Sequence, residues 1–218
     1  MKYPFKLIFA LSFMLCSLLG LSDQAWSAEV TPDEMLRQTT EEILTLVKQD
    51  RDLQSGDKQK AYALVETHIV PRFDFVRMTR LALGKNWNKA TPEQQAAVVE
   101  AFRNLLVRTY SSAITRFHKE TFTYKPWVGK AEDVTTSVQS VVSDGSRSVP
   151  IDYAMARVDN TWKVYDIKVD GISLVTNYRS DFNDRINAAG IDGLIKDLQE
   201  KARIAGQAAD NKSVKKGQ

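Results

Sequence analysis

A carboxylate in an apolar stretch is the side chain best placed for catalysis. Asp166 lies between apolar neighbours in a predicted strand, and a carboxyl group held among apolar side chains has a raised pKa and can serve as a general base. Asp152 and Tyr153 would stand opposite it on the preceding strand. The alternative is a structural role, in which Asp166 accepts hydrogen bonds from the backbone or from Arg179 and holds the corner between strand and helix. We favour the structural role.

Other signatures of catalysis or metal binding are missing from the sequence. His68 and His118 are each predicted near a helix end, and neither has neighbours at metal-ligand spacing. The HExxH and GxSxG patterns, the Walker loop and the dinucleotide-binding glycines are also absent. The sequence therefore predicts no metal site and no cofactor, and Asp166 is its best candidate for a general base.

The N-terminus has the layout of a secretory signal peptide. Lys2 and Lys6 precede an apolar run over residues 7–21, and small residues stand at −3 and −1 of a cleavage site after Ser27. The run is shorter than the roughly 20 residues that a membrane-spanning helix needs. We predict a cleaved signal peptide over residues 1–27 and a protein of the bacterial periplasm, with an uncleaved anchor as the alternative.

The cysteine count and the charge exclude several classes of protein. The only cysteine, Cys16, lies inside the signal peptide, and Leu15 before it is too large for a lipoprotein site. The remaining chain has no disulfide, no cysteine nucleophile and no thiolate metal site. Cleavage after Ser27 removes two lysines and one aspartate, which changes the formal net charge from +3 to +2. This charge is too small for a nucleic-acid-binding protein.

Helix-start signatures divide the first half of the chain. Thr31-Pro32-Asp33-Glu34 and Thr91-Pro92-Glu93-Gln94 each place a threonine N-cap before a proline, with Glu or Gln positioned to close a capping box. Apolar periodicity predicts helices over residues 32–50, 57–69, 73–83 and 92–118. The helix over 73–83 is apolar around much of its circumference, so it is either buried on most sides or lines a cavity.

From residue 121 the apolar period changes to two, which is typical of strands. The turns at Asp144-Gly145 and Asp159-Asn160 join the later strands as hairpins. Strands are expected over residues 121–126, 134–142, 149–156 and 162–169. The predicted fold is α+β, with a four-stranded antiparallel sheet, cone-shaped as in NTF2-like proteins, packed against a helical layer.

Two helices are predicted to close the chain, over residues 173–189 and 191–205, with Gly190 between them. Residues 208–218 are small, polar and lysine-bearing, which predicts a disordered tail. The length after cleavage is that of one domain, which we place over residues 28–207.

The most specific segment is residues 162–182, WKVYDIKVDGISLVTNYRSDF. Its motifs at residues 164–167, 171–175 and 177–179, followed by Phe182, resemble the MlaC family of periplasmic phospholipid-binding proteins, also called the toluene-tolerance auxiliary family. The resemblance extends over most of the chain after the signal peptide. It implies a deep apolar cavity between the sheet and the helices, which takes both acyl chains and leaves the head group near solvent.

The lipid-binding residues expected from this resemblance are apolar side chains of the helices and the sheet. Burial of each methylene is worth about 0.8 kcal/mol, so acyl-chain burial supplies the affinity with little head-group chemistry. The expected set is Phe73, Phe75, Met78, Leu81, Phe102, Leu105, Tyr110, Val149, Ile151, Tyr153, Met155, Val164, Ile167, Val169, Leu174 and Tyr178.

The resemblance also implies a function and partners. It implies a carrier that moves phospholipid between an outer-membrane lipoprotein complex and an inner-membrane ABC transporter with an MCE-domain subunit, and so supports outer-membrane lipid asymmetry. Phospholipid would be cargo, contacts with the membrane complexes would be transient, and no nucleic acid would bind. The alternatives are a small enzyme on an NTF2-like fold with Asp166 as base, or an adaptor with a filled core.

The basic side chains have two interpretations each. Arg179 either holds a phosphate or an acidic partner, or pairs with a nearby aspartate such as Asp166, Asp170 or Asp181 to set the helix angle; we favour the pairing. The cluster of Arg72, Arg77 and Lys85 either meets an acidic partner or is a solvated basic face, and we favour the solvated face.

Overall fold

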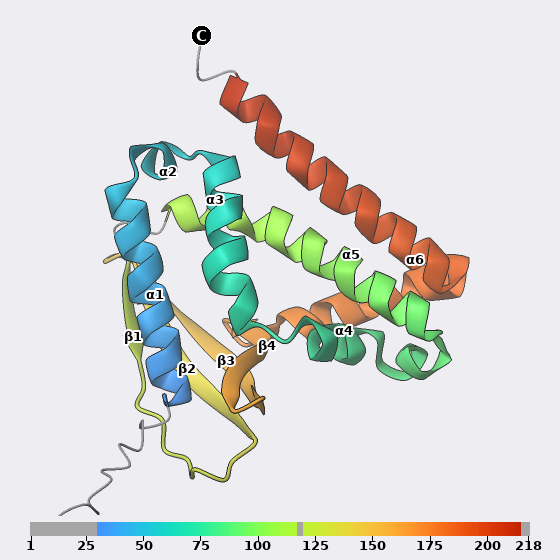
Figure 1. Ribbon diagram of the computed structural model, residues 1–218, viewed down its shortest axis with the longest axis horizontal. Helices are drawn as coiled ribbons and strands as arrows, with labels where there is room; N and C mark the ends of the chain where they lie inside the picture. The colour runs from blue at the N-terminus through green and yellow to red at the C-terminus, as the bar shows by residue number, and fades with distance from the viewer. Residues whose placement is uncertain (1–29, 117–119, 215–218) are drawn as a thin grey trace, which may run out of the picture.

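The computed structural model describes residues 30–116 and 120–214, which form a five-stranded antiparallel sheet and a set of helices (Figure 1). The predicted signal peptide lies outside the described residues. The mixed helix and antiparallel-sheet class is confirmed, with one strand more than predicted. The helices are α1 (Pro32–Gln49), α2 (Arg51–Ser55), α3 (Lys58–Leu64), α4 (Phe75–Leu83), α5 (Pro92–Tyr110) and α6 (Leu174–Val214).

The sheet is a simple meander in the order β1-β2-β3-β4-β5. Asp159 and Asn160 both have positive φ (48° and 60°), as a two-residue hairpin turn between twisted strands requires. The strands are β1 (Thr121–Tyr124), β2 (Thr135–Ser143), β3 (Ser148–Val158), β4 (Thr161–Val169) and β5 (Ile172–Ser173). Alternation of apolar residues thus located the four long strands to within a few residues.

The fifth strand was not predicted, and it includes Ser173, at which we began the predicted helix. Asp170 and Gly171 again have positive φ (53° and 79°), so the chain reverses there as a hairpin. Ile172 then pairs with Val169, and Ser173 with Lys168, before α6 begins at Leu174. Two residues are too short to show a period, so only the turn indicates this strand.

The two predicted capping boxes have different outcomes. At α5 the box is present: the Gln94 N–H donates to the Thr91 hydroxyl, and the Thr91 N–H donates to the Gln94 side chain, both at 3.2 Å. At α1 the Thr31 hydroxyl donates to the Asp33 carboxylate instead, at 2.6 Å, and makes no cap hydrogen bond. Thr31 is therefore the N-cap by position, but the predicted capping box is absent at α1.

Two predicted helices are shorter than expected. After α3 the chain continues as a π-helical turn (Val65–Ile69) and a 3₁₀ turn (Val70–Arg72), in which Pro71 has no N–H to donate to an α-helical hydrogen bond. After α5 it tightens into a 3₁₀ segment (Ser111–Arg116), and the predicted end at His118 lies outside the described residues. A further 3₁₀ segment, Gly84–Lys89, joins α4 to α5.

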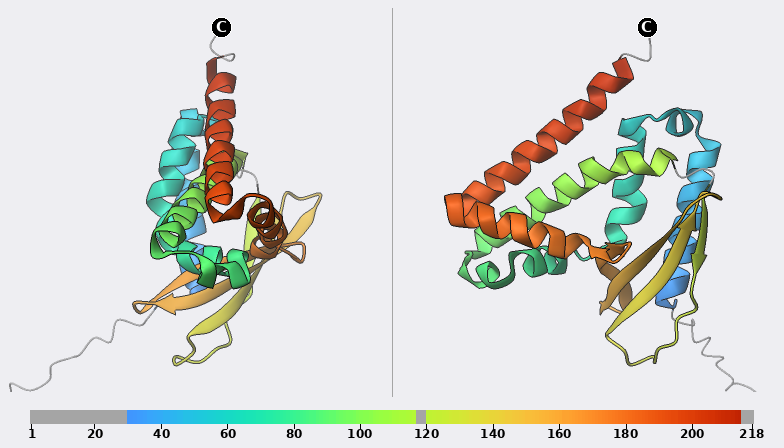
Figure 2. Two further views of the ribbon diagram at one scale, coloured as in Figure 1. Left: turned by 90° about the vertical axis from the view of Figure 1, so that its right-hand side faces the viewer. Right: turned by 180° about the vertical axis from the view of Figure 1, so that it is seen from behind.

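α6 consists of two helices joined at Gly190, as predicted. Gly190 has φ 69° and ψ −178°, a conformation that is essentially restricted to glycine. The first half leads away from the sheet, and the second half folds back alongside α5 (Figures 1 and 2). The second half continues to Val214, past the predicted end at Ala205 and into the segment for which we predicted disorder; residues 215–218 lie outside the described residues.

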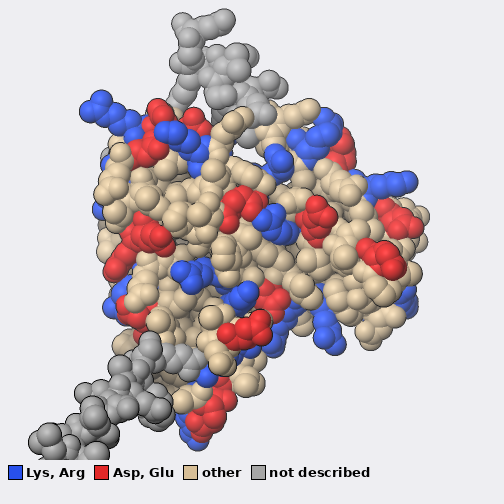
Figure 3. Space-filling view, in the orientation of Figure 1, with Lys and Arg blue, Asp and Glu red and all other residues tan. Residues whose placement is uncertain are grey.

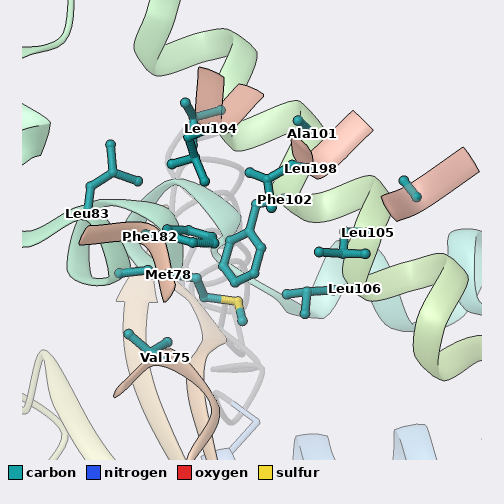
Figure 4. Close-up of a cluster of buried hydrophobic side chains, with 13 residues drawn as sticks. Met78, Leu83, Ala101, Phe102, Leu105, Leu106, Val175, Phe182, Leu194 and Leu198 are labelled. Atoms are coloured by element: carbon teal, nitrogen blue, oxygen red, sulfur yellow. The ribbon is translucent and has the colours of Figure 1, made fainter. Parts of the chain in front are cut away.

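The largest core cluster joins α4, α5 and both halves of α6 (Figure 4). Phe102 is fully buried, and its ring lies edge-on to those of Tyr178 and Phe182, with centroids 4.9 and 5.0 Å apart. A second cluster packs beneath α1, α2 and α3, and a third joins α1 to the sheet. The helical layer therefore has its own core, separate from the contact between α1 and the sheet.

Candidate functional site

The face of the sheet that α1 covers, hereafter the inner face, is the candidate site (Figures 1 and 2). Residues paired directly across antiparallel strands point to the same face, so the strand register defines its members. One row crosses all five strands, and two shorter rows flank it. The long row is Ile172, Val169, Ile151, Ser140 and Tyr124; the flanking rows are Val149, Val142 and Phe122, and Ile167, Tyr153 and Val138.

Coverage of the inner face changes along the strands. Where Met35 and Leu36 of α1 pack, the side chains of Met155 and Val164 are fully buried. Farther along, Val149 and Ile151 are only partly buried, Val169 is 46% exposed and Ile172 is 69% exposed. β3 is the central strand, where complete burial of apolar side chains is the norm. The inner face therefore presents apolar surface that the described part of the chain covers only in part.

Hydroxyl groups lie within this apolar face. The Thr40 hydroxyl of α1 shares a 2.6 Å hydrogen bond with the Tyr124 hydroxyl, and the Tyr124 and Tyr153 ring centroids are 6.4 Å apart. Burial raises the pKa of both tyrosines, so they stay neutral donors at any physiological pH. The buried Ser140 hydroxyl lies near Tyr153 but makes no hydrogen bond of good geometry with any described residue. These groups add polar anchoring points to an otherwise apolar surface.

The structure divides the sixteen expected lipid-binding residues between two places. Members of the helical core, or packed against it, are Phe73, Phe75, Met78, Leu81, Phe102, Leu105, Leu174 and Tyr178. Members of the inner face are Val149, Ile151, Tyr153, Met155, Val164, Ile167 and Val169. Tyr110 is 49% exposed at the end of α5 and belongs to neither. α4, which we expected to be buried or to line a cavity, buries Met78, Ala82 and Leu83 in the helical core.

The deep cavity that the resemblance implies does not coincide with either of two hollows on the described residues. A hollow of about 340 Å³ lies between α5 and the second half of α6, and one of about 550 Å³ lies at the β5 edge of the sheet. None of the sixteen residues lines either of these two hollows. The helical members are already packed against one another, so the partly covered inner face is the apolar surface that remains.

Asp166 has the structural surroundings that we favoured. Its carboxylate is buried and accepts hydrogen bonds from the Ser173 hydroxyl, at 2.6 Å, and from the Val175 N–H, at 3.1 Å. Its partner across the strands is Ala154, not Asp152 or Tyr153 as we expected, because a register shift intervenes. Both oxygens are thus used to hold the corner between β4 and α6.

Arg179 has a different partner from those predicted. Its Nε and Nη2 donate to the Leu81 carbonyl at 3.0 and 2.8 Å, which completes the C-terminal turn of α4 instead of pairing with an aspartate. His68 pairs with Glu42 at 2.8 Å, and His118 lies outside the described residues. Within residues 30–116 and 120–214, no three His, Cys, Asp or Glu side chains are placed to hold a metal ion.

Comparison with known proteins places this architecture in a family. The family model described as MlaC protein matches residues 37–200, which is most of the chain. The chain belongs to the MlaC family. The match includes α1 to α5, the sheet and α6 as far as its second half, so both apolar regions described above fall within it.

Individual MlaC-family relatives agree with this assignment. A solved phospholipid-binding protein from Ralstonia solanacearum, in complex with a phospholipid, is 37% identical, with a TM-score of 0.73 over 79% of this chain and 97% of that one. The toluene tolerance protein ttg2D of Pseudomonas putida is 27% identical over 84% of this chain and 87% of its own. The intermembrane phospholipid transport system binding protein MlaC of Haemophilus influenzae is 19% identical over 80% of this chain and 84% of its own.

Sequence reasoning missed several inner-face residues of this MlaC-family chain. The predicted site did not include five inner-face residues, Ile172, Phe122, Val142, Tyr124 and Ser140. The signal that identifies them is the spacing of the hairpin turns, which sets the register and so the face to which each side chain points.

Charged side chains do not gather into one patch on the face shown in Figure 3, where basic and acidic groups alternate. Arg77 stacks on the Tyr165 ring, with its guanidinium carbon 4.0 Å from the ring centroid. Arg72 and Lys85 are exposed. The arrangement is that of a solvated surface with one ordered arginine.

Proposed function

We propose that the protein is a periplasmic phospholipid carrier without catalytic activity. It holds the acyl chains of a diacyl phospholipid against the inner face of its sheet and carries the lipid between an outer-membrane lipoprotein complex and an inner-membrane ABC transporter with an MCE-domain subunit. This transport maintains the lipid asymmetry of the outer membrane. The observation that carries the proposal is the likeness to the Ralstonia solanacearum protein, which was solved with a phospholipid.

The inner face supports the proposal physically. A buried methylene contributes about 0.8 kcal/mol, so a free phospholipid does not cross an aqueous compartment alone, whereas an apolar protein surface can carry it. Val149, Ile151 and Val169 offer such a surface in the middle and at the edge of the sheet. The adjacent helical core is tightly packed and supports the sheet without having to open.

The enzyme alternative lacks a free catalytic group. Asp166 would be the base, but both of its oxygens accept hydrogen bonds from Ser173 and Val175, and it faces Ala154. A general base needs an oxygen within reach of a substrate proton. The carrier function therefore fits the geometry better than proton abstraction.

Export through residues 1–27 is part of the proposal. Among the described residues, no helix is both long enough and apolar enough to cross a membrane. Sequencing the N-terminus of protein purified from the periplasm should give Ala28 as the first residue. A chain that stays in the membrane fraction with Met1 intact would contradict this part of the proposal.

Native mass spectrometry of detergent-free protein tests the carrier function. The wild type should show a mass excess of one diacyl phospholipid, and organic extraction should identify it. Val149→Glu places a charge on the inner face and should abolish the bound lipid. Val141→Glu is the matched control, because Val141 lies on the opposite face of the sheet and is exposed. An apo mass for the wild type, with no uptake from liposomes, would overturn the proposal.

A further inference from the structure

The hollow at the β5 edge of the sheet combines polar donors with apolar surface. It has a volume of about 550 Å³ and lies between the end of β4, the β4–β5 turn, β5 and the first two turns of α6. Its lining contains no carboxylate. The residues that line it are Lys168, Gly171, Ile172, Ser173, Thr176, Asn177 and Ser180.

Most donors in this hollow are free to bind a ligand. Among the described residues, the side chains of Thr176, Asn177 and Ser180 make no hydrogen bond, and Lys168 has no carboxylate within ion-pair distance, although Asp152 stands across from it on β3. Two N–H groups in the first turn of α6, those of Val175 and Thr176, already bond to Asp166 and Ser173. Side chains, not the helix end, therefore supply the binding groups.

The apolar side of the hollow leads to the inner face. Ile172 pairs directly with Val169, and Val169 pairs with Ile151, so these three side chains form a continuous apolar row from the hollow to the central strand. Ile172 and Val169 are 69% and 46% exposed. An ammonium, two hydroxyls and an amide beside an exposed apolar row match a molecule with an anionic end and long apolar chains.

We propose that this hollow binds the phosphate group of the phospholipid head, with Lys168 as the charged contact and Thr176, Asn177 and Ser180 as hydrogen-bond donors. The proposal rests on the carrier function and adds where the head group sits. Lysine binds phosphate as a compact point charge and needs no bidentate geometry, which suits an open hollow. Lys168 and its partner Ser173 point to the face opposite Val169 and Ile172, so the lipid bends round the β5 edge, and its acyl chains pass over Ile172 and Val169 onto the inner face.

Binding of short-chain lipids to purified protein tests the site. The probes are dioctanoyl phosphatidylglycerol, dioctanoylglycerol, which has the same chains but no phosphate, and inorganic phosphate. Lys168→Glu should weaken phosphatidylglycerol binding by about ten-fold and leave dioctanoylglycerol binding unchanged. Lys168→Arg should bind as the wild type does. Lys163→Glu makes the same charge change on the same strand, outside the hollow, and should have little effect.

A second variant in the same hollow keeps the proposal testable if Lys168→Glu does not fold. Asn177→Asp places a negative charge at an exposed position across the hollow from Lys168 and should also weaken only the phosphate-bearing lipid. Thermal unfolding of each variant confirms that the fold is intact.

The outcomes separate this site from the carrier function. Equal binding of phosphatidylglycerol by Lys168→Glu and Lys163→Glu would overturn the head-group site and leave the carrier function standing. Lysine-dependent binding of inorganic phosphate, with lipid binding unaffected, would assign the hollow to free phosphate and overturn the head-group assignment. Failure of the wild type to bind either dioctanoyl lipid would overturn both.

Discussion

The helical core and the inner face of the sheet are built from the same kinds of residue but differ in how completely they are packed. Phe102, Met78 and Leu194 in the helical core have almost no exposed surface. On the inner face, Val149 and Ile151 are partly buried, and Val169 is almost half exposed. Complete packing stabilises the fold, whereas incomplete packing leaves apolar surface for a ligand. Under the proposed function, the two regions divide stability and binding between them.

The strongest test of this division is truncation at the centre of the helical core. Phe102→Ala removes a fully buried ring that contacts Tyr178 and Phe182, and should lower the free energy of unfolding by about 4 kcal/mol. Val149→Ala removes a partly buried side chain of the inner face and should cost about 1 kcal/mol or less. Urea unfolding of lipid-free protein measures both.

Bound lipid should narrow the difference in cost between Phe102→Ala and Val149→Ala. Bound phospholipid stabilises the native state by mass action, and the gain should be smaller in Val149→Ala than in the wild type. Similar costs for the two substitutions in lipid-free protein would show that the inner face is as tightly packed as the helical core, and the proposed division would be wrong.

The corner between sheet and α6 connects the two regions, and Asp166 holds it. Asp166→Asn keeps the shape: its Oδ1 still accepts from the Val175 N–H, and its NH2 donates to the Ser173 hydroxyl, so two hydrogen bonds to a charged acceptor become two weaker neutral ones. We expect a loss of about 1 kcal/mol in the free energy of unfolding. Urea unfolding measures this cost, and uptake of lipid from liposomes measures the function.

The same variant separates carrier from enzyme. A carrier with Asp166→Asn should still take up lipid at temperatures where it is folded. Asp166→Ala removes both acceptor oxygens and should cost more than Asp166→Asn, because the Val175 N–H then loses its partner. Unchanged stability of Asp166→Asn would contradict the structural role of the carboxylate.

Sequence patterns predicted more of the fold than of the site, for a physical reason. The capping box at Thr91 and the alternation in β2, β3 and β4 depend on neighbours in sequence, and the structure confirms them. Whether an apolar residue is packed depends on segments far away in sequence. Phe102 and Ile151 are equally apolar, yet only Phe102 is enclosed, because both halves of α6 pack against α5. Composition alone does not distinguish a completely packed core from a binding surface.

The smallest expected effect concerns the contact that ties the loop after β1 to α1, beside the inner face. Burial pushes the pKa of Asp33 upward, but hydrogen bonds from the Thr31 hydroxyl, the Trp127 N–H and N–H groups of the first turn outweigh it, so the pKa is lowered. A depressed pKa in the folded state means that ionised Asp33 stabilises the protein above the pKa of the unfolded chain, about 3.9. This contribution is lost as the pH falls through the folded-state pKa.

Asp33→Asn should therefore cost about 1 kcal/mol at pH 6 and progressively less below pH 4, where the wild type itself becomes protonated. Urea unfolding at a series of pH values measures the difference, with Asp52→Asn as an exposed control on α2. A difference that stays constant from pH 6 to pH 2 would show that Asp33 acts through packing and not through its charge. Because Trp127 packs against Trp162 at the covered end of the inner face, loss of this contact should also loosen the cover over bound acyl chains.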